Sequence, residues 1–234
     1  MKPLVHVILR SFNSPRVVEL LQQLSLSNIR PESVTIVVDA KRDFIDTPKL
    51  IHEKTYPFPI LVQSLDDYGW AKALNTAIVS LSALGSTANE FIMAISNEVR
   101  IEPDGIEMLL HVASKDGASC GYALFEGRDE PSYTVPRNTC AIWNMLLFST
   151  VGEFDERLDS AGGMEDYEMV MRAFDRLHLL PFAAERRMEL LIRDPVTFAQ
   201  KLSAEERAMK TIDMRYSDGV LKTLKAHLTS ENKT

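Results

Sequence analysis

The chain has 234 residues, of which 45% are hydrophobic and 25% are charged, which is typical of a globular protein with a sizeable core. The formal charge of −7 argues against broad binding to nucleic acids or anionic membrane surfaces, because both reward dense positive charge. An anionic ligand must therefore be held by a local arrangement of groups.

No apolar run approaches the roughly 20 residues that cross a bilayer. The N-terminus does not have the architecture of a signal peptide. We therefore expect a cytoplasmic protein, with peripheral attachment to the inner membrane face left open. Cys120 and Cys140 have no metal-type spacing, and we expect buried free thiols, with a disulfide as the alternative.

Apolar strands and amphipathic helices alternate along the first half of the chain. We predict strands at residues 4–9, 34–38, 59–62 and 91–95, and helices that begin at Pro15, Trp70 and Pro103. Strands that are apolar throughout, alternating with helices, indicate a mostly parallel sheet with helices on both faces. The fold class is therefore predicted to be α/β.

The second half predicts strands at 118–125 and 139–148, separated by a polar loop at 126–137. A last strand is predicted at 188–192 and a helix at 203–216, after which residues 217–234 resemble a tail. No repeat and no long linker interrupts the chain. We therefore expect one domain, at residues 1–216.

A helix that begins near Gly162 and ends near Leu177 carries the most informative acidic residue. Its apolar residues recur with helical spacing from Met169 to Leu177, and Asp166 precedes them on the same side. An inward carboxylate is costly unless it is used, and the helix dipole holds it ionised. The alternative is that Glu-Asp simply favours the start of a helix. The other charged residues of this helix are expected on its outer face: Glu165, Glu168, Arg172, Asp175 and Arg176.

Polar residues follow three of the predicted strands. Asn13, Asp39 and Glu98 each fall just past the C-terminus of a predicted strand. Ligands of parallel α/β sheets bind outside the carboxyl ends of the strands, so these residues are expected to line one crevice.

Several segments, in this order, together resemble the family-2 inverting glycosyltransferases of the GT-A fold. The resemblance covers residues 4–180 and rests on five segments: Val-Ile-Leu-Arg-Ser-Phe-Asn at 7–13, Val-Val-Asp at 37–39, Tyr-Gly-Trp-Ala-Lys-Ala-Leu-Asn at 68–75, Ser-Asn-Glu at 96–98, and Gly-Glu-Phe-Asp at 152–155 with Gly-Met-Glu-Asp at 163–166 and Arg172. Two positions depart from the family pattern. Arg10 replaces a proline, and Ser96 stands in the first place of the Asp-x-Asp metal motif.

The resemblance implies one GT-A-like domain, with a nucleotide-binding half at 1–117 and an acceptor-side half at 118–216. It implies a hexosyltransferase that moves a sugar, with inversion, from a nucleotide-sugar donor to a hydroxyl of a saccharide or lipid-linked acceptor, in polysaccharide or glycoconjugate biosynthesis. Asp166 would be the general base, with Glu165 beside it. The implied donor contacts are Arg10, Phe12, Asn13, Asp39, Gly69, Lys72, Asn75, Asn97 and Arg193.

The implied metal is Mg²⁺ or Mn²⁺ at Glu98, in a site weakened by Ser96. Where many relatives have a histidine ligand, this chain has Arg193, which could neutralise a diphosphate directly. Two other readings stay open. The first is a catalytically degenerate relative that binds a nucleotide or saccharide without transfer, motivated by Arg10 and Ser96. The second is an unrelated nucleotide-binding α/β protein, which the absence of a usual glycine-rich phosphate loop disfavours.

Overall fold

A seven-stranded sheet organises the computed structural model, which describes residues 3–11, 15–41, 43, 45–66, 69–82, 89–125, 137–158, 164–191 and 207–231. The strand order is β3-β2-β1-β4-β7-β6-β8. The bounds are β1 (Leu4–Arg10), β2 (Ser33–Asp39), β3 (Ile60–Leu65), β4 (Glu90–Ser96), β6 (Ala118–Tyr122), β7 (Cys140–Asn144) and β8 (Leu180–Ala183). Only the pairings of β7 with β4 and β6 are antiparallel among those of this sheet in the described residues. The prediction of a mostly parallel sheet is confirmed.

A second, two-stranded sheet pairs β5 (Val99–Arg100) with β9 (Glu189–Leu190) in antiparallel orientation. It joins the turn after β4 to a segment about ninety positions later in the chain. The carbonyl of Glu98 extends this connection by accepting a hydrogen bond from Leu191 N–H at 2.8 Å.

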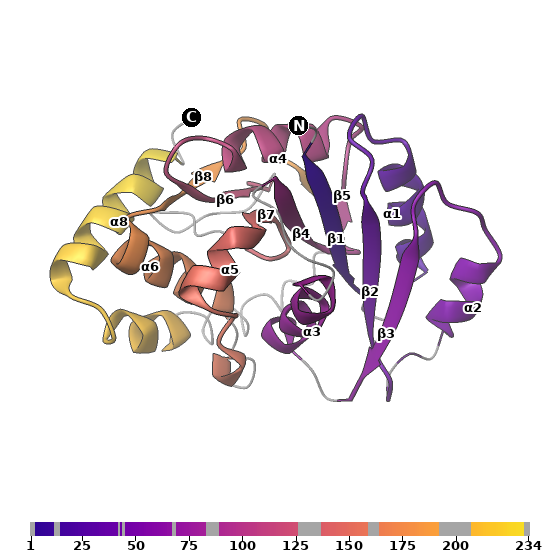
Figure 1. Ribbon diagram of the computed structural model, residues 1–234, viewed down its shortest axis with the longest axis horizontal. Helices are drawn as coiled ribbons and strands as arrows, with labels where there is room; N and C mark the ends of the chain where they lie inside the picture. Colours follow the sequence, from indigo (N-terminus) through magenta and orange to yellow (C-terminus); the bar gives the residue numbers. More distant parts are fainter. Residues whose placement is uncertain are drawn as a thin grey trace.

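Helices cover both faces of the large sheet (Figure 1). The helices are α1 (Arg16–Ser25), α2 (Thr47–His52), α3 (Trp70–Ser82), α4 (Gly105–Ala113), α5 (Met145–Val151), α6 (Glu165–Leu177) and α8 (Asp218–Glu231), with a 3-10 turn η1 at Glu156–Leu158 and a further helical segment at 207–213. One core lies between the sheet and α3, α5, α6 and α8, and the other between the sheet and α1 and α4. Each central strand is therefore buried on both faces, which explains its uninterrupted apolar sequence.

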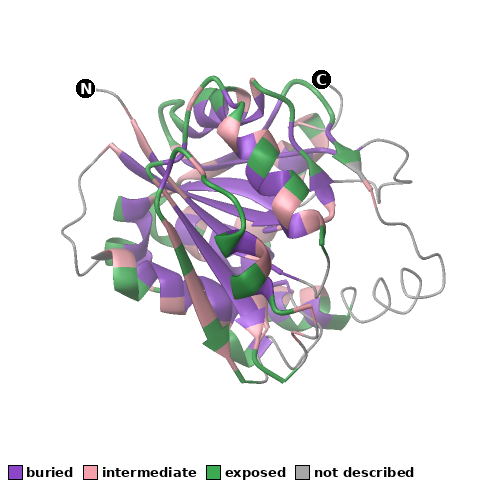
Figure 2. Ribbon diagram, turned by 90° about the vertical axis from the view of Figure 1, so that its right-hand side faces the viewer, coloured by how far each residue is buried: buried purple, intermediate pink, exposed green. Residues whose placement is uncertain are grey.

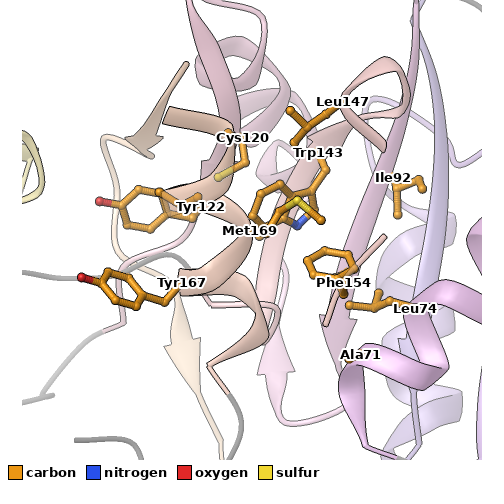
Figure 3. Packing of buried hydrophobic residues seen from close by; sticks show 14 of the residues in the cluster. Ala71, Leu74, Ile92, Cys120, Tyr122, Trp143, Leu147, Phe154, Tyr167 and Met169 are labelled. Atoms are coloured by element: carbon orange, nitrogen blue, oxygen red, sulfur yellow. The ribbon is translucent and has the colours of Figure 1, made fainter. Parts of the chain in front are cut away.

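The larger core is built around Trp143 of β7, which is fully buried. Its ring meets Phe154 edge-on, with 5.5 Å between ring centroids, and Met169 of α6 belongs to the same core cluster (Figure 3). Figure 2 shows the buried residues running along the strands, with exposed residues on the outer faces of the helices. This packing fixes α6 against the sheet, and α6 carries Asp166.

Three expectations about secondary structure need correction. The strand predicted at 139–148 ends at Asn144, whose side chain accepts a hydrogen bond from Leu146 N–H at 2.9 Å and so caps α5. The short helix α2 was not expected. Residues 217–234 were expected to form a tail, but α8 occupies most of this range, and its Leu224 and Leu228 are fully buried.

The prediction of buried free thiols is confirmed for Cys120 and Cys140. Burial raises the pKa of both thiols, so they remain protonated. Within the described residues, no helix has the length and apolar character needed to span a membrane.

Candidate active site

The carboxyl ends of three neighbouring strands bring Arg10, Asp39 and Ser96 to one edge of the sheet. Arg10 of β1 is the register partner of Val37 in β2 and of Ser96 in β4, and Asp39 ends β2. Side chains alternate between the two faces of a strand. Ile8, Val37 and Ala94 belong to the core beneath α3, so the side chains of Arg10, Asp39 and Ser96 lie on this same face.

Arg10 is held by the first residue of α3. Its guanidinium carbon lies 5.5 Å from the centroid of the Trp70 ring, a distance at which the cation is attracted by the face of the indole. Gly69 directly precedes this helix, and Lys72 follows in its first turn, with its Nζ 3.5 Å from the carbonyl oxygen of Asp66. Two basic side chains therefore accompany Asp39 at this edge.

The end of β4 and the turn after it contain the three residues that stand at the place of a metal motif, Ser96, Asn97 and Glu98. Ser96 N–H donates to Thr139 O at 2.9 Å, and Ser96 Oγ accepts from Glu98 N–H at 3.3 Å. Asn97 is 1% exposed, and within the described residues both ends of its side-chain amide have no hydrogen-bond partner. Such a buried polar group costs free energy unless a ligand or water satisfies it. Glu98 is half-buried.

Asp166 lies in the first turn of α6 and is 4% exposed. Its Oδ2 accepts a hydrogen bond from Asn138 N–H at 2.8 Å, and its Oδ1 accepts one from Tyr167 N–H at 2.8 Å. The expected inward orientation of Asp166 is confirmed. These two hydrogen bonds fix the orientation of the Asp166 carboxylate.

Asn138 joins this helix to the edge of the sheet. Its Nδ2 donates to Glu165 Oε1 at 3.3 Å, and its Oδ1 accepts from Trp143 Nε1 at 3.0 Å. Thr139, the next residue, pairs with Ser96 through the 2.9 Å bond to the strand end. Asp166 is therefore connected to the carboxyl end of β4 through one short segment. Asn138 was not among the site residues expected from the sequence. An asparagine just before an apolar strand is its only sequence signal.

The N-terminal part of the expected outer face of α6 is covered, while Asp175 and Arg176 further along the helix are exposed as expected. Glu165 and Glu168 are 3% and 6% exposed, because Asn138 contacts the first and the segment 207–217 covers the second. Glu168 accepts from Arg172 Nη2 at 2.8 Å and from the Tyr216 hydroxyl at 3.1 Å. Burial, followed by the charge of Glu168, raises the pKa of Tyr216, so the phenol stays a neutral donor. The expectation for Glu165 and Glu168 was wrong, because helical spacing does not reveal which distant segment packs on a face.

A charged pocket of about 450 Å³ opens beside this pair, lined by Glu153, Asp155, Arg157, Glu168, Arg172, Asp175, Arg176, Arg215 and Tyr216. Asp155 accepts two hydrogen bonds from the Arg157 side chain, at 2.7 and 2.8 Å, and one from Arg215 at 3.1 Å. The Arg157 hydrogen bonds are the main cause that lowers the pKa of Asp155 to about 2. These contacts anchor the segment that leads into α6.

Asn75 of α3 is buried against the segment that precedes α6. It is 4% exposed, its Nδ2 donates to Phe154 O at 2.9 Å and to Glu156 Oε1 at 3.0 Å, and its Oδ1 accepts from Phe154 N–H at 3.0 Å. These bonds clamp α3 to the segment before α6. Of the remaining residues named from the sequence, Phe12, Asn13 and Arg193 lie outside the described residues.

No protein-family model matches the sequence, and no curated protein is similar to it. The structure is similar to that of the mannosyltransferase PcManGT from Pyrobaculum calidifontis, solved in complex with GDP-Man and Mn²⁺, with a TM-score of 0.74 and 15% sequence identity over 93% of this chain and 66% of that chain. The fold is that of the GT-A glycosyltransferases.

Two further GT-A structures are similar. S. aureus TarS 1-349 in complex with UDP-GlcNAc has a TM-score of 0.61 and 17% identity over 83% of this chain and 59% of that chain. Glucosyl-3-phosphoglycerate synthase from Mycobacterium tuberculosis, in complex with Mn²⁺, UDP and glucosyl-3-phosphoglycerate, has a TM-score of 0.61. Its sequence identity is 10%, over 85% of this chain and 76% of that chain. The chain thus spans less than two thirds of the length of the first two proteins. At such identities the likeness establishes the GT-A fold.

Proposed function

We propose that the protein is an inverting glycosyltransferase that moves a sugar from a nucleotide-sugar donor to a hydroxyl group of a saccharide or lipid-linked acceptor. The observation that carries the proposal is the buried, hydrogen-bonded carboxylate of Asp166, one segment away from the carboxyl end of β4. In parallel α/β sheets this edge is where ligands bind. The GT-A fold supports the same assignment.

Asp166 is proposed as the general base. An inverting transfer is an in-line displacement, in which the acceptor oxygen attacks the anomeric carbon as the bond to the diphosphate breaks. Asp166 accepts the proton of the attacking hydroxyl, and its two N–H donors hold the carboxylate in a fixed orientation. Glu165 is proposed to support Asp166, because Asn138 joins the two carboxylates. The Asn138 side chain donates to Glu165 and its backbone N–H donates to Asp166.

The donor contacts are proposed for the strand edge. Asp39 accepts a hydrogen bond from a base N–H or a ribose hydroxyl, while Arg10 and Lys72 contact the diphosphate. Gly69 and Asn97, whose side-chain amide has no partner in the described part of the chain, are the other proposed donor contacts within it. Phe12, Asn13 and Arg193 are proposed donor contacts from their sequence positions. Asn75 supports the site through its clamp on Phe154.

A divalent metal fits this edge only if the diphosphate of the donor supplies most of its ligands. Within the described residues, no group of three or more His, Cys, Asp or Glu side chains could hold a metal ion. Glu98 supplies one carboxylate, and Asn97 supplies an amide oxygen that has no partner among the described residues, which suits Mg²⁺ or Mn²⁺ held mainly by diphosphate oxygens. A bound metal would neutralise charge on the departing diphosphate. The Mn²⁺ in the complexes of PcManGT and glucosyl-3-phosphoglycerate synthase supports testing both ions.

The proposal is tested by measuring release of nucleoside diphosphate from a panel of UDP- and GDP-sugars with candidate acceptors. Asp166→Asn is expected to lower kcat by about 10²-fold or more, because it removes the base. Asp175→Asn is the matched control, since it makes the same change at an exposed position of the same helix. Equal kcat values for Asp166→Asn and wild type would remove Asp166 from the mechanism.

A second candidate function is nucleotide or saccharide binding without transfer, as in a catalytically degenerate relative. It is favoured by the Arg10 and Ser96 departures from the family motifs. Calorimetric titration with UDP and GDP, with and without Mn²⁺, together with the donor panel, separates the two. Binding of nucleotide without turnover on any donor and acceptor combination would favour the non-catalytic function.

A further inference from the structure

Arg10 and Ser96 make the proposed donor site more positive than the family pattern would, because that pattern has a proline and an aspartate at these two positions. The two residues are register partners on adjacent parallel strands, whose backbones lie about 4.8 Å apart. Both side chains lie on the α3 face, at the edge where Asp39 ends the next strand. A cation therefore stands directly beside a neutral hydroxyl, and the nearest carboxylate of the turn is Glu98.

Arg10 is suited to bind a diphosphate. A guanidinium is always charged, and its planar edge can donate two parallel hydrogen bonds to phosphate oxygens. The guanidinium carbon lies over the Trp70 ring, 5.5 Å from its centroid, and this cation–π contact restrains the group. This restraint reduces the entropy lost on binding. Because the whole chain carries a net charge of −7, a local cation is needed to attract an anionic donor.

Binding of a diphosphate depends less on a divalent metal when a guanidinium contacts it directly. Glu98 and Asn97 offer one carboxylate and one amide oxygen, which is a sparse set for Mg²⁺ or Mn²⁺. The Asn97 amide, 1% exposed and without a partner among the described residues, is a second polar group at this turn that a ligand would satisfy. We infer that Arg10 is a diphosphate ligand that offsets the neutral residue at Ser96, so that binding of nucleoside diphosphate does not depend on a divalent metal.

This inference rests on the proposed function and is tested by nucleotide binding. Isothermal titration calorimetry with GDP and with UDP, each in EDTA and in Mn²⁺, gives four dissociation constants for every variant. Wild type is expected to bind one of the nucleotides in EDTA with a Kd within about fivefold of that in Mn²⁺. Arg10→Ala is expected to raise the Kd in EDTA about tenfold or more, as loss of a charged hydrogen-bond donor does.

Ser96→Asp is the second variant, and it keeps both Arg10 and Trp70. The new carboxylate beside Arg10 is expected to weaken binding in EDTA about tenfold, with most of the affinity restored by Mn²⁺. Arg30→Ala is the matched control, because it removes an exposed arginine that lies away from the carboxyl edge, before β2. It is expected to leave all four constants unchanged.

The outcomes separate this inference from the proposed function. Binding by wild type that requires Mn²⁺ overturns the inference and leaves the glycosyltransferase proposal standing. Equal affinities in EDTA for wild type, Arg10→Ala and Ser96→Asp, with the variants folded by circular dichroism, overturn it as well. Absence of binding to GDP and UDP under both conditions would count against both proposals.

Discussion

The backbone N–H of Asn138 donates to Asp166 Oδ2 at 2.8 Å, and the Asn138 side chain joins Glu165 to Trp143 in the same buried network. The segment that carries Asn138 also pairs with the end of β4. One residue therefore couples the candidate base to the sheet edge. Its side chain determines how rigidly the first turn of α6 is held.

Replacing this side chain is expected to destabilise the protein. Asn138→Ala leaves Glu165 and the Trp143 N–H without this partner in a buried site, and the free energy of unfolding should fall by about 2–3 kcal/mol. Urea unfolding of the variant and wild type measures the change. Asn28→Ala is the control, because its amide bonds to Glu107 at the surface and its loss should cost less than about 0.5 kcal/mol. Similar values for the two variants would contradict a structural role for Asn138.

The ion pair of Glu168 and Arg172 should be sensitive to the loss of one partner. Their side chains are only 7% and 15% exposed. Arg172→Leu leaves a buried carboxylate uncompensated and also removes the bonds to Val151 O and Glu153 O, so we expect a loss of about 3 kcal/mol.

A double-mutant cycle separates the charge from the packing. Glu168→Leu together with Arg172→Leu should be less destabilised than the sum of the single variants, since no unpaired charge remains. Chemical unfolding at pH 7 measures all three. Strict additivity would show that the two side chains do not interact in stabilising the fold.

Asp155 should make stability depend on pH below about 4. Its pKa lies at about 2 in the folded protein, chiefly because Arg157 donates two hydrogen bonds to it, and near the ordinary value of 3.8 when unfolded. A lowered folded pKa contributes stability that is fully present above the unfolded pKa and is lost as pH falls toward 2.

Thermal unfolding between pH 5 and pH 2 tests this contribution. Asp155→Asn should start from a lower Tm at pH 5 and lose less stability on acidification than wild type. Asp116→Asn, a change of the same kind at an exposed carboxylate, should follow the wild-type profile. Parallel profiles for Asp155→Asn and wild type would exclude Asp155 as a source of the pH dependence.

Gly121 allows α4 to approach β6 closely. A Cβ at this position would meet Leu109 O at 2.4 Å and Val112 Cγ2 at 2.7 Å. Gly121→Ala should therefore push the helix from the sheet and cost about 1–3 kcal/mol, as overpacking does.

Gly117→Ala is an informative comparison. Gly117 has a φ of +74° and open space around it, so its substitution strains the backbone without a clash. We expect a smaller loss, of about 1 kcal/mol, and a core that still packs normally. Urea unfolding ranks the two variants, and the near-ultraviolet circular dichroism spectrum should change for Gly121→Ala alone.

The α/β class, the parallel sheet and several of its strands and helices followed from local patterns. Strands buried on both faces need continuous apolar residues, and a helix on a core needs them at helical spacing, so β1, β2, β4, α3 and α6 were readable along the chain. The inward side of Asp166 followed in the same way. Short elements were less visible, because α2 has six residues and α5 begins at a cap that continues an apolar strand.

Contacts between residues far apart in the chain were decided by the tertiary structure. Asn138 meets Asp166 and Glu165, Asn75 meets Phe154, and Tyr216 covers Glu168, over separations of 27 to 79 residues. Periodicity assigns a residue to a face but does not say which distant segment packs there, because that depends on how all the layers assemble. For this reason Arg10 could be recognised in the sequence as an unusual residue, while its cation–π contact with Trp70 and its pairing with Ser96 required the folded sheet.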